Sequence, residues 1–402
     1  MIELLFLLLP VAAASGWWLA RRDGSARRSP PEGSAPAFLR GLNYLLDEQP
    51  DKAIDVFLEL AEVDGETVET HLALGSLFRR RGEVDRAIRL HQNLIARHNL
   101  SRDQRGLALF ELGQDYMRAG LLDRAELLFQ ELVDLGLHRE RALRGLLDIF
   151  QQERDWEKCL EMAERLKPFT DRPMFREMAQ YHCELAEEAR RRADPTAARR
   201  HLARAQSADP MGVRATLLEG EMALAEGDPQ SAFGHFMRVA DQGVRYLPEV
   251  LPALLECLTA LGRTDRLAVL ESLASRHPSS SLILALSEAV REERGTEAAL
   301  AVLTRYLAGH VDLAALERLL DLQSQQGERT ERDRVIHDVA RYLLVRQPAY
   351  QCDHCGFSAR ALHWQCPSCK RWGTVAPVQP ECIPGAEVLD GPRLAAAASP
   401  RV

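Results

Sequence analysis

The sequence predicts an all-α fold in which a long array of helical repeats lies between an N-terminal transmembrane helix and a small C-terminal metal domain. Three observations support this prediction. An apolar run opens the chain, a helical motif recurs with a period of about 34 residues, and four of the eight cysteines lie between residues 352 and 369. With 402 residues, the chain is long enough for several such units.

The apolar run from Leu4 to Ala20 carries no charge and is just long enough to cross a bilayer as a helix. Two tryptophans lie near its end, and four arginines follow between residues 21 and 28. A cleaved signal peptide is the alternative, because residues 11–14 are small, but its basic residues should precede the apolar region. We therefore expect a single-pass anchor at residues 1–20, a flexible linker at 21–36, and the bulk of the chain in the cytoplasm.

Residues 37–346 are expected to form the repeat array. In each unit a small residue is followed three positions later by a bulky one, and an alanine twelve positions after the first is followed by another bulky residue. This spacing packs two antiparallel helices closely at their small residues, which is the tetratricopeptide pattern. The three clearest units contain Gly41, Tyr44, Ala53 and Phe57; Gly75, Phe78, Ala87 and His91; and Gly113, Tyr116, Ala125 and Phe129.

Later repeats follow the pattern more loosely. Gly82 and Gly120 are expected to end helices, Cys159 is expected to pack at an alanine position, and residues 311–346 are expected to cap the array. The later units are marked by Leu147 and Cys159; Ala186 and Ala198; Gly220, Ala232 and Phe236; Leu255, Leu258 and Leu267; and Leu286, Ala289, Ala298 and Val302.

Repeat arrays of this kind curve and present an inner groove that binds peptides or protein surfaces. A passive spacer is the alternative. The sequence does not identify which groove residues would contact a partner.

The cysteine spacing near the chain end is typical of a tetrahedral metal site. Each Cys-x2-Cys turn directs two sulfurs at one ion, and two such turns leave no coordination position open, which favours a structural role. Zinc suits four thiolates, and iron can occupy the same cage. Trp364 and Trp372 are expected to pack against this cage, and Gly356 to adopt the positive φ that the first turn requires. The predicted ligands are Cys352, Cys355, Cys366 and Cys369.

Composition and motifs argue against several other functions. The net charge of −8 does not favour a nucleic-acid-binding zinc ribbon. The remaining cysteines are scattered, which does not suit a secreted disulfide scaffold and favours a reducing compartment. The sequence contains no glycine-rich phosphate loop, nucleophile elbow or His-Glu-x-x-His motif, so we expect a protein that is not an enzyme.

The order of anchor, repeats and four-cysteine site resembles the lipopolysaccharide assembly protein B family of Gram-negative bacteria. The most specific segments are the opening Glu-Leu-Leu-Phe-Leu-Leu-Leu-Pro-Val-Ala-Ala-Ala from Glu3, the stretch from Arg81 to Gln92, and the stretch from Cys352 to Trp372. The resemblance implies that the last domain, residues 347–376, is a rubredoxin-like zinc knuckle. Residues 377–402, rich in alanine and proline, depart from the family and are expected to be a disordered tail.

The resemblance also implies a function. Members of this family are inner-membrane adaptors that work with a membrane-bound AAA+ metalloprotease to promote degradation of the UDP-acyl-N-acetylglucosamine deacetylase of the lipid A pathway. They also contact lipopolysaccharide transport or assembly proteins. The alternative is a rubredoxin-like iron protein that transfers electrons or acts in redox chemistry on a repeat scaffold.

Overall fold

The computed structural model describes residues 68–170, 174–327, 331–378 and 381–382, with scattered residues between 39 and 56. The expected anchor at residues 1–20 and the linker at 21–36 lie outside the described residues. Within the described part, every helix is too short or too polar to span a bilayer. The chain divides into two compact units, Met1–Asp155 with Glu164–Phe169, and Trp156–Ala163 with Thr170–Val402.

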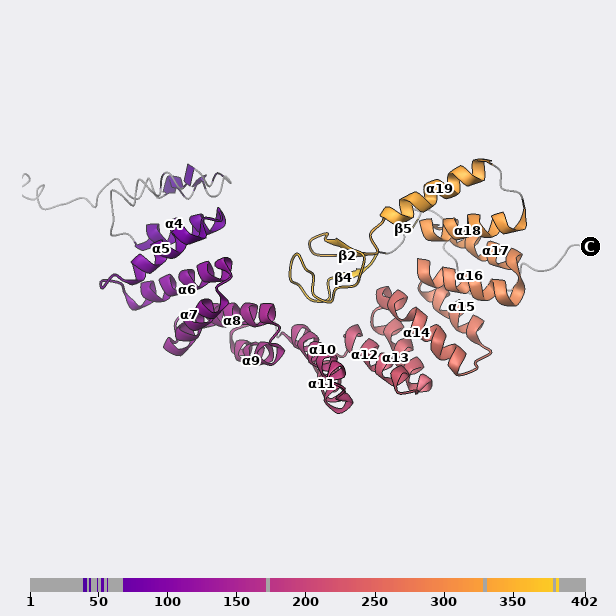
Figure 1. The fold of residues 1–402 in the computed structure, drawn as a ribbon, viewed down its shortest axis with the longest axis horizontal. Helices are drawn as coiled ribbons and strands as arrows, with labels where there is room; N and C mark the ends of the chain where they lie inside the picture. Colours follow the sequence, from indigo (N-terminus) through magenta and orange to yellow (C-terminus); the bar gives the residue numbers. More distant parts are fainter. Residues whose placement is uncertain are drawn as a thin grey trace, which may run out of the picture. The chain divides into compact units, whose positions relative to one another are not determined.

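The described helices of the first unit form successive antiparallel pairs (Figure 1). They are α4 (Val68–Arg80), α5 (Val84–Ile95), α6 (Arg102–Ala119), α7 (Leu122–Leu135) and α8 (Arg139–Glu153). Helix α9 (Trp156–Leu166) is divided between the two units, and the 3-10 turn η1 (Lys167–Phe169) follows it.

The second unit continues with helix pairs and ends in a small β domain (Figure 1). Its helices are α10 (Phe175–Arg191), α11 (Pro195–Ala208), α12 (Val213–Ala225), α13 (Pro229–Gln242), the 3-10 turn η2 (Val244–Tyr246), α14 (Leu247–Ala260), α15 (Arg266–Arg276), α16 (Ser280–Arg294), α17 (Thr296–Leu307), α18 (Leu313–Gln326) and α19 (Glu331–Arg346).

Burial confirms the tetratricopeptide spacing. The residues at the alanine position of six units are completely buried, and one of them is the cysteine that the pattern placed there. Gly82 and Gly120 have φ of 82° and 74°, which confirms that left-handed residues end these helices. The six buried residues are Ala53, Ala87, Ala125, Cys159, Ala198 and Ala232.

In the units that open with glycine, the absent side chain leaves room for the bulky side chain of the second helix. A Cβ atom on Gly113 would lie 2.5 Å from the ring of Phe129, and one on Gly220 would lie 2.4 Å from the ring of Phe236. Cβ atoms in proteins essentially never lie within 3.0 Å of a heavy atom of another residue, so a neighbouring group would have to move. The aromatic ring therefore occupies the volume that any larger residue would need.

In the unit formed by α16 and α17, the buried positions of the repeat motif lie one residue later in the chain than predicted. Ala299 and Leu303 are completely buried, whereas the predicted Ala298 is only partly buried. Counting back from Ala299 with the usual spacing makes Ser287 the small residue in place of Leu286. The Ser287 hydroxyl donates to the carbonyl of Leu284 at 2.8 Å, which satisfies it at a fully buried position.

One bulky position in the first unit is held by a polar side chain. His91 is completely buried, and its Nδ1 lies 2.5 Å from Oδ2 of the equally buried Asp115. Arg79 approaches the other oxygen of this carboxylate at 2.6 Å and also pairs with Glu111 at 2.6 Å. Because each charged group has an opposite partner, the network satisfies the buried carboxylate.

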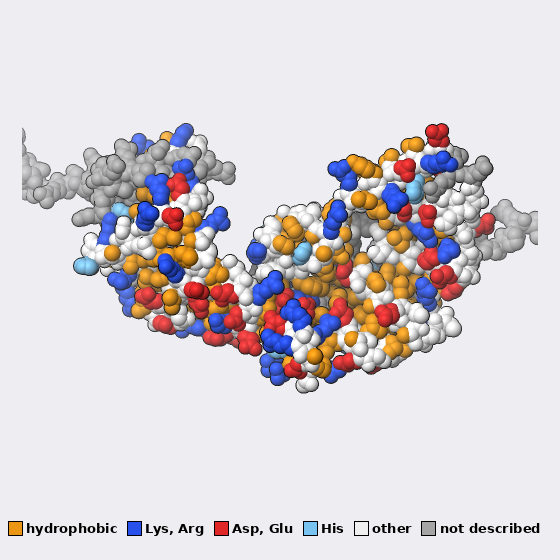
Figure 2. All heavy atoms as spheres, in the orientation of Figure 1, with side chains coloured by type: hydrophobic (Ala, Val, Ile, Leu, Met, Phe, Trp, Pro, Cys, Tyr) orange, Lys and Arg blue, Asp and Glu red, His pale blue; other side chains and the backbone are white. Residues whose placement is uncertain are grey.

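The terminal helix α19 differs from a polar cap. It buries His337 and Ala340 on one face, but its other face carries apolar side chains that are 39–59% exposed. A cap of a repeat array is expected to have a polar outer face. Figure 2 shows these hydrophobic side chains interspersed with charged ones along α19. They are Val335, Ile336, Val339, Tyr342 and Leu343.

Two small sheets complete the described chain. In the first, β2 (Tyr350–Cys352) pairs antiparallel with both β3 (Ser358–Ala359) and β4 (Val375–Pro377). In the second, β1 (His310–Val311) pairs antiparallel with β5 (Glu381–Cys382). Of the segment expected to be a tail, Glu381 and Cys382 pair with β1, whereas residues 379–380 and 383–402 lie outside the described residues.

The helix pair α12–α13 provides a matched test of close packing. We expect Gly220→Ala to destabilise the protein by about 1–3 kcal/mol, because its Cβ would overlap the Phe236 ring. The control Gly234→Ala, in the same pair, has nothing within 4 Å of its Cβ and should stabilise by roughly 0.5–1 kcal/mol. Urea unfolding followed by circular dichroism measures both, and equal effects would contradict the packing argument.

Candidate metal centre

The structure brings the four predicted cysteines together. Their sulfurs all lie within 4.8 Å of one another. The Cys352 and Cys369 sulfurs are 3.8 Å apart, and those of Cys355 and Cys366 are 3.7 Å apart. A tetrahedral zinc ion with Zn–S bonds of about 2.3 Å requires sulfur separations of about 3.8 Å, so this donor set fits such an ion.

Two similar turns position the sulfurs. Each Cys-x2-Cys pair is followed by a left-handed residue, Gly356 with φ 74° and Lys370 with φ 60°. The Gly356 N–H donates to the Cys352 carbonyl and the Lys370 N–H to the Cys366 carbonyl, both at 2.9 Å. Gly356 was predicted. Lys370 was missed because its side chain gives no sign of a positive φ, although its place directly after the second cysteine of a pair matches that of Gly356.

The surroundings of Cys352 and Cys366 shift the pKa values of their thiols in opposite directions. Burial disfavours the Cys352 thiolate, but the Thr374 hydroxyl at 3.3 Å and the N–H groups of Cys355 and His354 favour it and lower its pKa to about 6. Burial raises the pKa of Cys366 to about 11, and the nearby N–H groups do not outweigh it. A shell of four thiolates at neutral pH therefore needs the charge of a metal ion.

Trp364 attaches the metal domain to the repeats. It stacks on Tyr246 of η2 with ring centres 5.4 Å apart, and the Arg214 guanidinium lies 5.5 Å from its ring. Arg214 is only 2% exposed and is neutralised by Glu184 and Glu187 at 2.8 and 2.9 Å. Aromatic stacking and a desolvated cation on one indole ring each stabilise this contact.

Trp372 makes a second contact with the repeats. Its ring meets those of Trp156 and Tyr181 edge-on, with ring centres 5.8 Å apart in both cases. Trp364 and Trp372 were expected to pack against the cage, and the structure shows that both also contact aromatic side chains of the repeats. They contact the repeats because loops around a small cage have no core large enough for an indole, whereas the helices supply aromatic partners.

Hydrogen bonds complete the attachment. Arg245 pairs with the two carboxylate oxygens of Asp353 at 2.5 and 3.1 Å. The Tyr246 hydroxyl donates to the Val375 carbonyl at 3.1 Å, and the Tyr350 hydroxyl donates to Glu249 at 2.8 Å. The metal domain is therefore fixed to η2 and α14 by side chains from both partners.

Comparisons with known proteins agree with this architecture. A family model described as the rubredoxin metal binding domain matches residues 350–377, and a tetratricopeptide repeat model matches residues 72–136 and 183–243. Lipopolysaccharide assembly protein B of Escherichia coli K12 is 38% identical over 384 residues, which cover 94% of this chain and 99% of the relative. The chain belongs to the lipopolysaccharide assembly protein B family. The family member from Haemophilus influenzae is 35% identical over 397 residues, covering 94% of this chain and 98% of the relative.

Family membership confirms the predicted resemblance, and the two family models confirm the predicted combination of tetratricopeptide repeats with a C-terminal metal domain. Among solved structures, the MamA protein is similar in part. The alignment covers 45% of the present chain and 94% of the MamA chain, at 17% identity and a TM-score of 0.35.

The metal centre is tested by Cys352→Ser. The remaining three thiolates should not hold the ion, so bound metal should fall from about one per chain to near zero. The helices should remain, because stacking between neighbours confines the damage to the metal domain and its contacts. Elemental analysis and circular dichroism measure the two effects. Cys159→Ala is the control, since Cys159 is a buried packing residue, and its loss of metal would contradict the assignment.

Proposed function

We propose that this chain is a membrane-anchored cytoplasmic adaptor that regulates lipopolysaccharide synthesis through proteolysis. In this role it promotes degradation of the UDP-acyl-N-acetylglucosamine deacetylase by a membrane-bound AAA+ metalloprotease, and it links this step to lipopolysaccharide transport or assembly proteins. The observation that carries the proposal is family membership over 94% of the chain. The relatives are named for lipopolysaccharide assembly, and repeat arrays are used chiefly to bind other proteins.

The proposal includes a structural zinc ion held by Cys352, Cys355, Cys366 and Cys369. Four thiolates complete a tetrahedral shell, so the ion would supply folding free energy and leave no position for substrate. Iron in the same cage would instead give a one-electron carrier. That alternative is not favoured, because the relatives that match along the whole chain are named as assembly proteins. A colourless protein with one zinc per chain would support the proposal, and Fe–thiolate absorbance would contradict it.

The metal domain has a specific part in this proposal. Its two tryptophans contact Trp156, Tyr181 and Tyr246, which come from α9, α10 and η2. One small domain therefore fixes helices from several repeats with respect to one another within the second unit. We infer that it keeps the binding surface of these repeats in a shape that recognises the partner, because a preorganised surface costs less free energy to bind.

Membrane topology provides the first test. If the arginines after residue 20 set the orientation, a reporter fused after Val402 should be active only in the cytoplasm. Activity of a reporter that requires the periplasm would contradict the anchored, cytoplasmic arrangement. Deletion of residues 1–20 should give a folded protein that no longer lowers deacetylase levels, and full complementation by this form would show that the anchor is dispensable.

Deacetylase abundance provides the second test, and two variants separate metal binding from attachment. Cys352→Ser should lose the metal, whereas Trp372→Ala should keep it but lose the contacts with Trp156 and Tyr181. Both should raise deacetylase abundance several-fold, because both weaken the attachment of the metal domain to the repeats. The conservative Trp372→Phe should restore most of the turnover. Unchanged deacetylase levels in both variants, measured by immunoblot beside bound zinc, would contradict the adaptor mechanism.

A further inference from the structure

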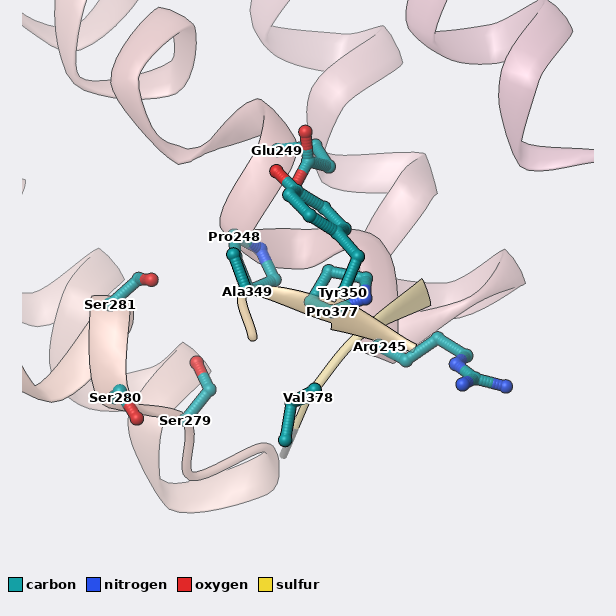
Figure 3. Close-up of a pocket in the computed structure, with 10 residues that line it drawn as sticks. All are labelled: Arg245, Pro248, Glu249, Ser279, Ser280, Ser281, Ala349, Tyr350, Pro377 and Val378. Carbon is teal, nitrogen blue, oxygen red and sulfur yellow. The ribbon is translucent and has the colours of Figure 1, made fainter. Parts of the chain in front are cut away.

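A pocket lies where the metal domain meets the repeats, away from the four cysteines. It has a volume of about 220 Å³ and is bounded by η2 and the start of α14, the first turn of α16, and the ends of β2 and β4. Figure 3 shows Ser279, Ser280 and Ser281 on one side and Glu249 with Tyr350 on the other. One water in the liquid occupies about 30 Å³, so the pocket has room for a small organic molecule.

The first turn of α16 presents unsatisfied donors to this pocket. Ser279 has the extended backbone of an N-cap residue, yet its side chain makes no cap hydrogen bond. Its hydroxyl is buried, the residue is 9% exposed, and Oγ has no hydrogen-bond partner among the described residues. Figure 3 shows this hydroxyl directed into the space between α16 and the end of β4. A buried hydroxyl without a partner costs free energy, which a ligand atom would recover.

The same helix end favours negative charge. Helix α16 has 15 residues, and its N-terminal N–H groups carry the positive end of the helix dipole. Among the described residues, no backbone or side-chain acceptor is paired with the N–H groups of Ser280 and Ser281. Free N–H groups at a helix N-terminus form a site for phosphate or carboxylate oxygens.

The opposite side of the pocket favours a hydrogen-bond donor on a ligand. Glu249 accepts one hydrogen bond, from the Tyr350 hydroxyl at 2.8 Å, and its carboxylate has capacity for more. Arg245 also lines the pocket, but its guanidinium is bonded to Asp353 and turns away from the serines in Figure 3. An inorganic anion in the pocket would therefore meet the Glu249 carboxylate without a cation to offset it.

We propose that this pocket binds a small zwitterion, with its phosphate or carboxylate at the N-terminus of α16 and its amine at Glu249. The serine hydroxyls and the free N–H groups would hold the oxyanion, and Glu249 would select molecules that also carry a positive charge. This site goes beyond the adaptor function and does not depend on it, since ligand binding is measured on the purified protein without the protease or the deacetylase.

The test uses the full chain with O-phosphoethanolamine, β-alanine and inorganic phosphate as probes, measured by isothermal titration calorimetry. We expect the two zwitterions to bind at millimolar concentrations and at least one of them to bind about tenfold more tightly than inorganic phosphate. Competition by a soluble short-chain phosphatidylethanolamine would assign the site to a lipid headgroup, and its failure to compete would assign the site to a free zwitterion.

Variants at the two ends test the assignment. Ser279→Asp places a carboxylate at the α16 N-cap, so it should abolish binding while raising the thermal stability of the protein. Glu249→Gln should reduce the preference for a zwitterion over inorganic phosphate by about tenfold. Ser275→Ala is the control, because the Ser275 hydroxyl bonds to the carbonyl of Ser272 on α15 and does not line the pocket. No binding of either zwitterion to the wild-type chain, or unchanged binding by Ser279→Asp, would overturn the proposal.

Discussion

Close packing of a glycine against a bulky side chain of the neighbouring helix is the constraint on which the best-defined helix pairs of the array depend. Where Gly113 and Gly220 meet Phe129 and Phe236, the ring fills the space that a side chain on the glycine would occupy. The two helices can therefore approach each other this closely only when the glycine position stays small, and the ring then fills the space between them. Repetition of this pairing sets the spacing between successive helices, and with it the position of every side chain that the array displays.

The metal domain depends on the array as much as on its four clustered cysteines. Its strands are only two or three residues long, so it has little apolar core of its own. Trp364 and Trp372 instead use the repeats as their core, and Arg214 supplies a neutralised cation beneath one of them. The domain is therefore one structural unit with the helices around it. This explains why its polar contacts, such as that between Tyr246 and Val375, include buried ones.

The sequence was most informative where the chemistry is local. The close approach of the four cysteines and the packing of small against bulky residues could be predicted, because turns and helix pairs depend on residues close in the chain. Ser287 was not predicted at the small position of its unit. Its hydroxyl bonds within its own helix, so the residue packs like an alanine, and the residue type alone does not reveal this. The partners of Trp364 and Trp372 could not be predicted, since they lie more than a hundred positions away in the chain.

Lys370 and Ser279 show a second limit of the sequence. A positive φ at a lysine, or a serine at an N-cap position that does not cap, follows from the surrounding packing rather than from the residue type. Sequence reasoning assigned neither residue a role. Both lie at turns beside the metal domain or its junction with the repeats, where tertiary contacts override local preference.

The attachment of the metal domain also affects how the chain acquires its fold. Contacts within a repeat array join near neighbours, which favours rapid folding, whereas the bonds from Arg245, Tyr246 and Tyr350 span 101 to 129 positions. During synthesis, helices α9 to α14 leave the ribosome long before the metal domain does, because the metal domain follows them in the chain. The nascent repeats must therefore hold the aromatic surface of Trp156, Tyr181 and Tyr246 exposed until synthesis ends. A truncation before the metal domain would leave that surface permanently uncovered.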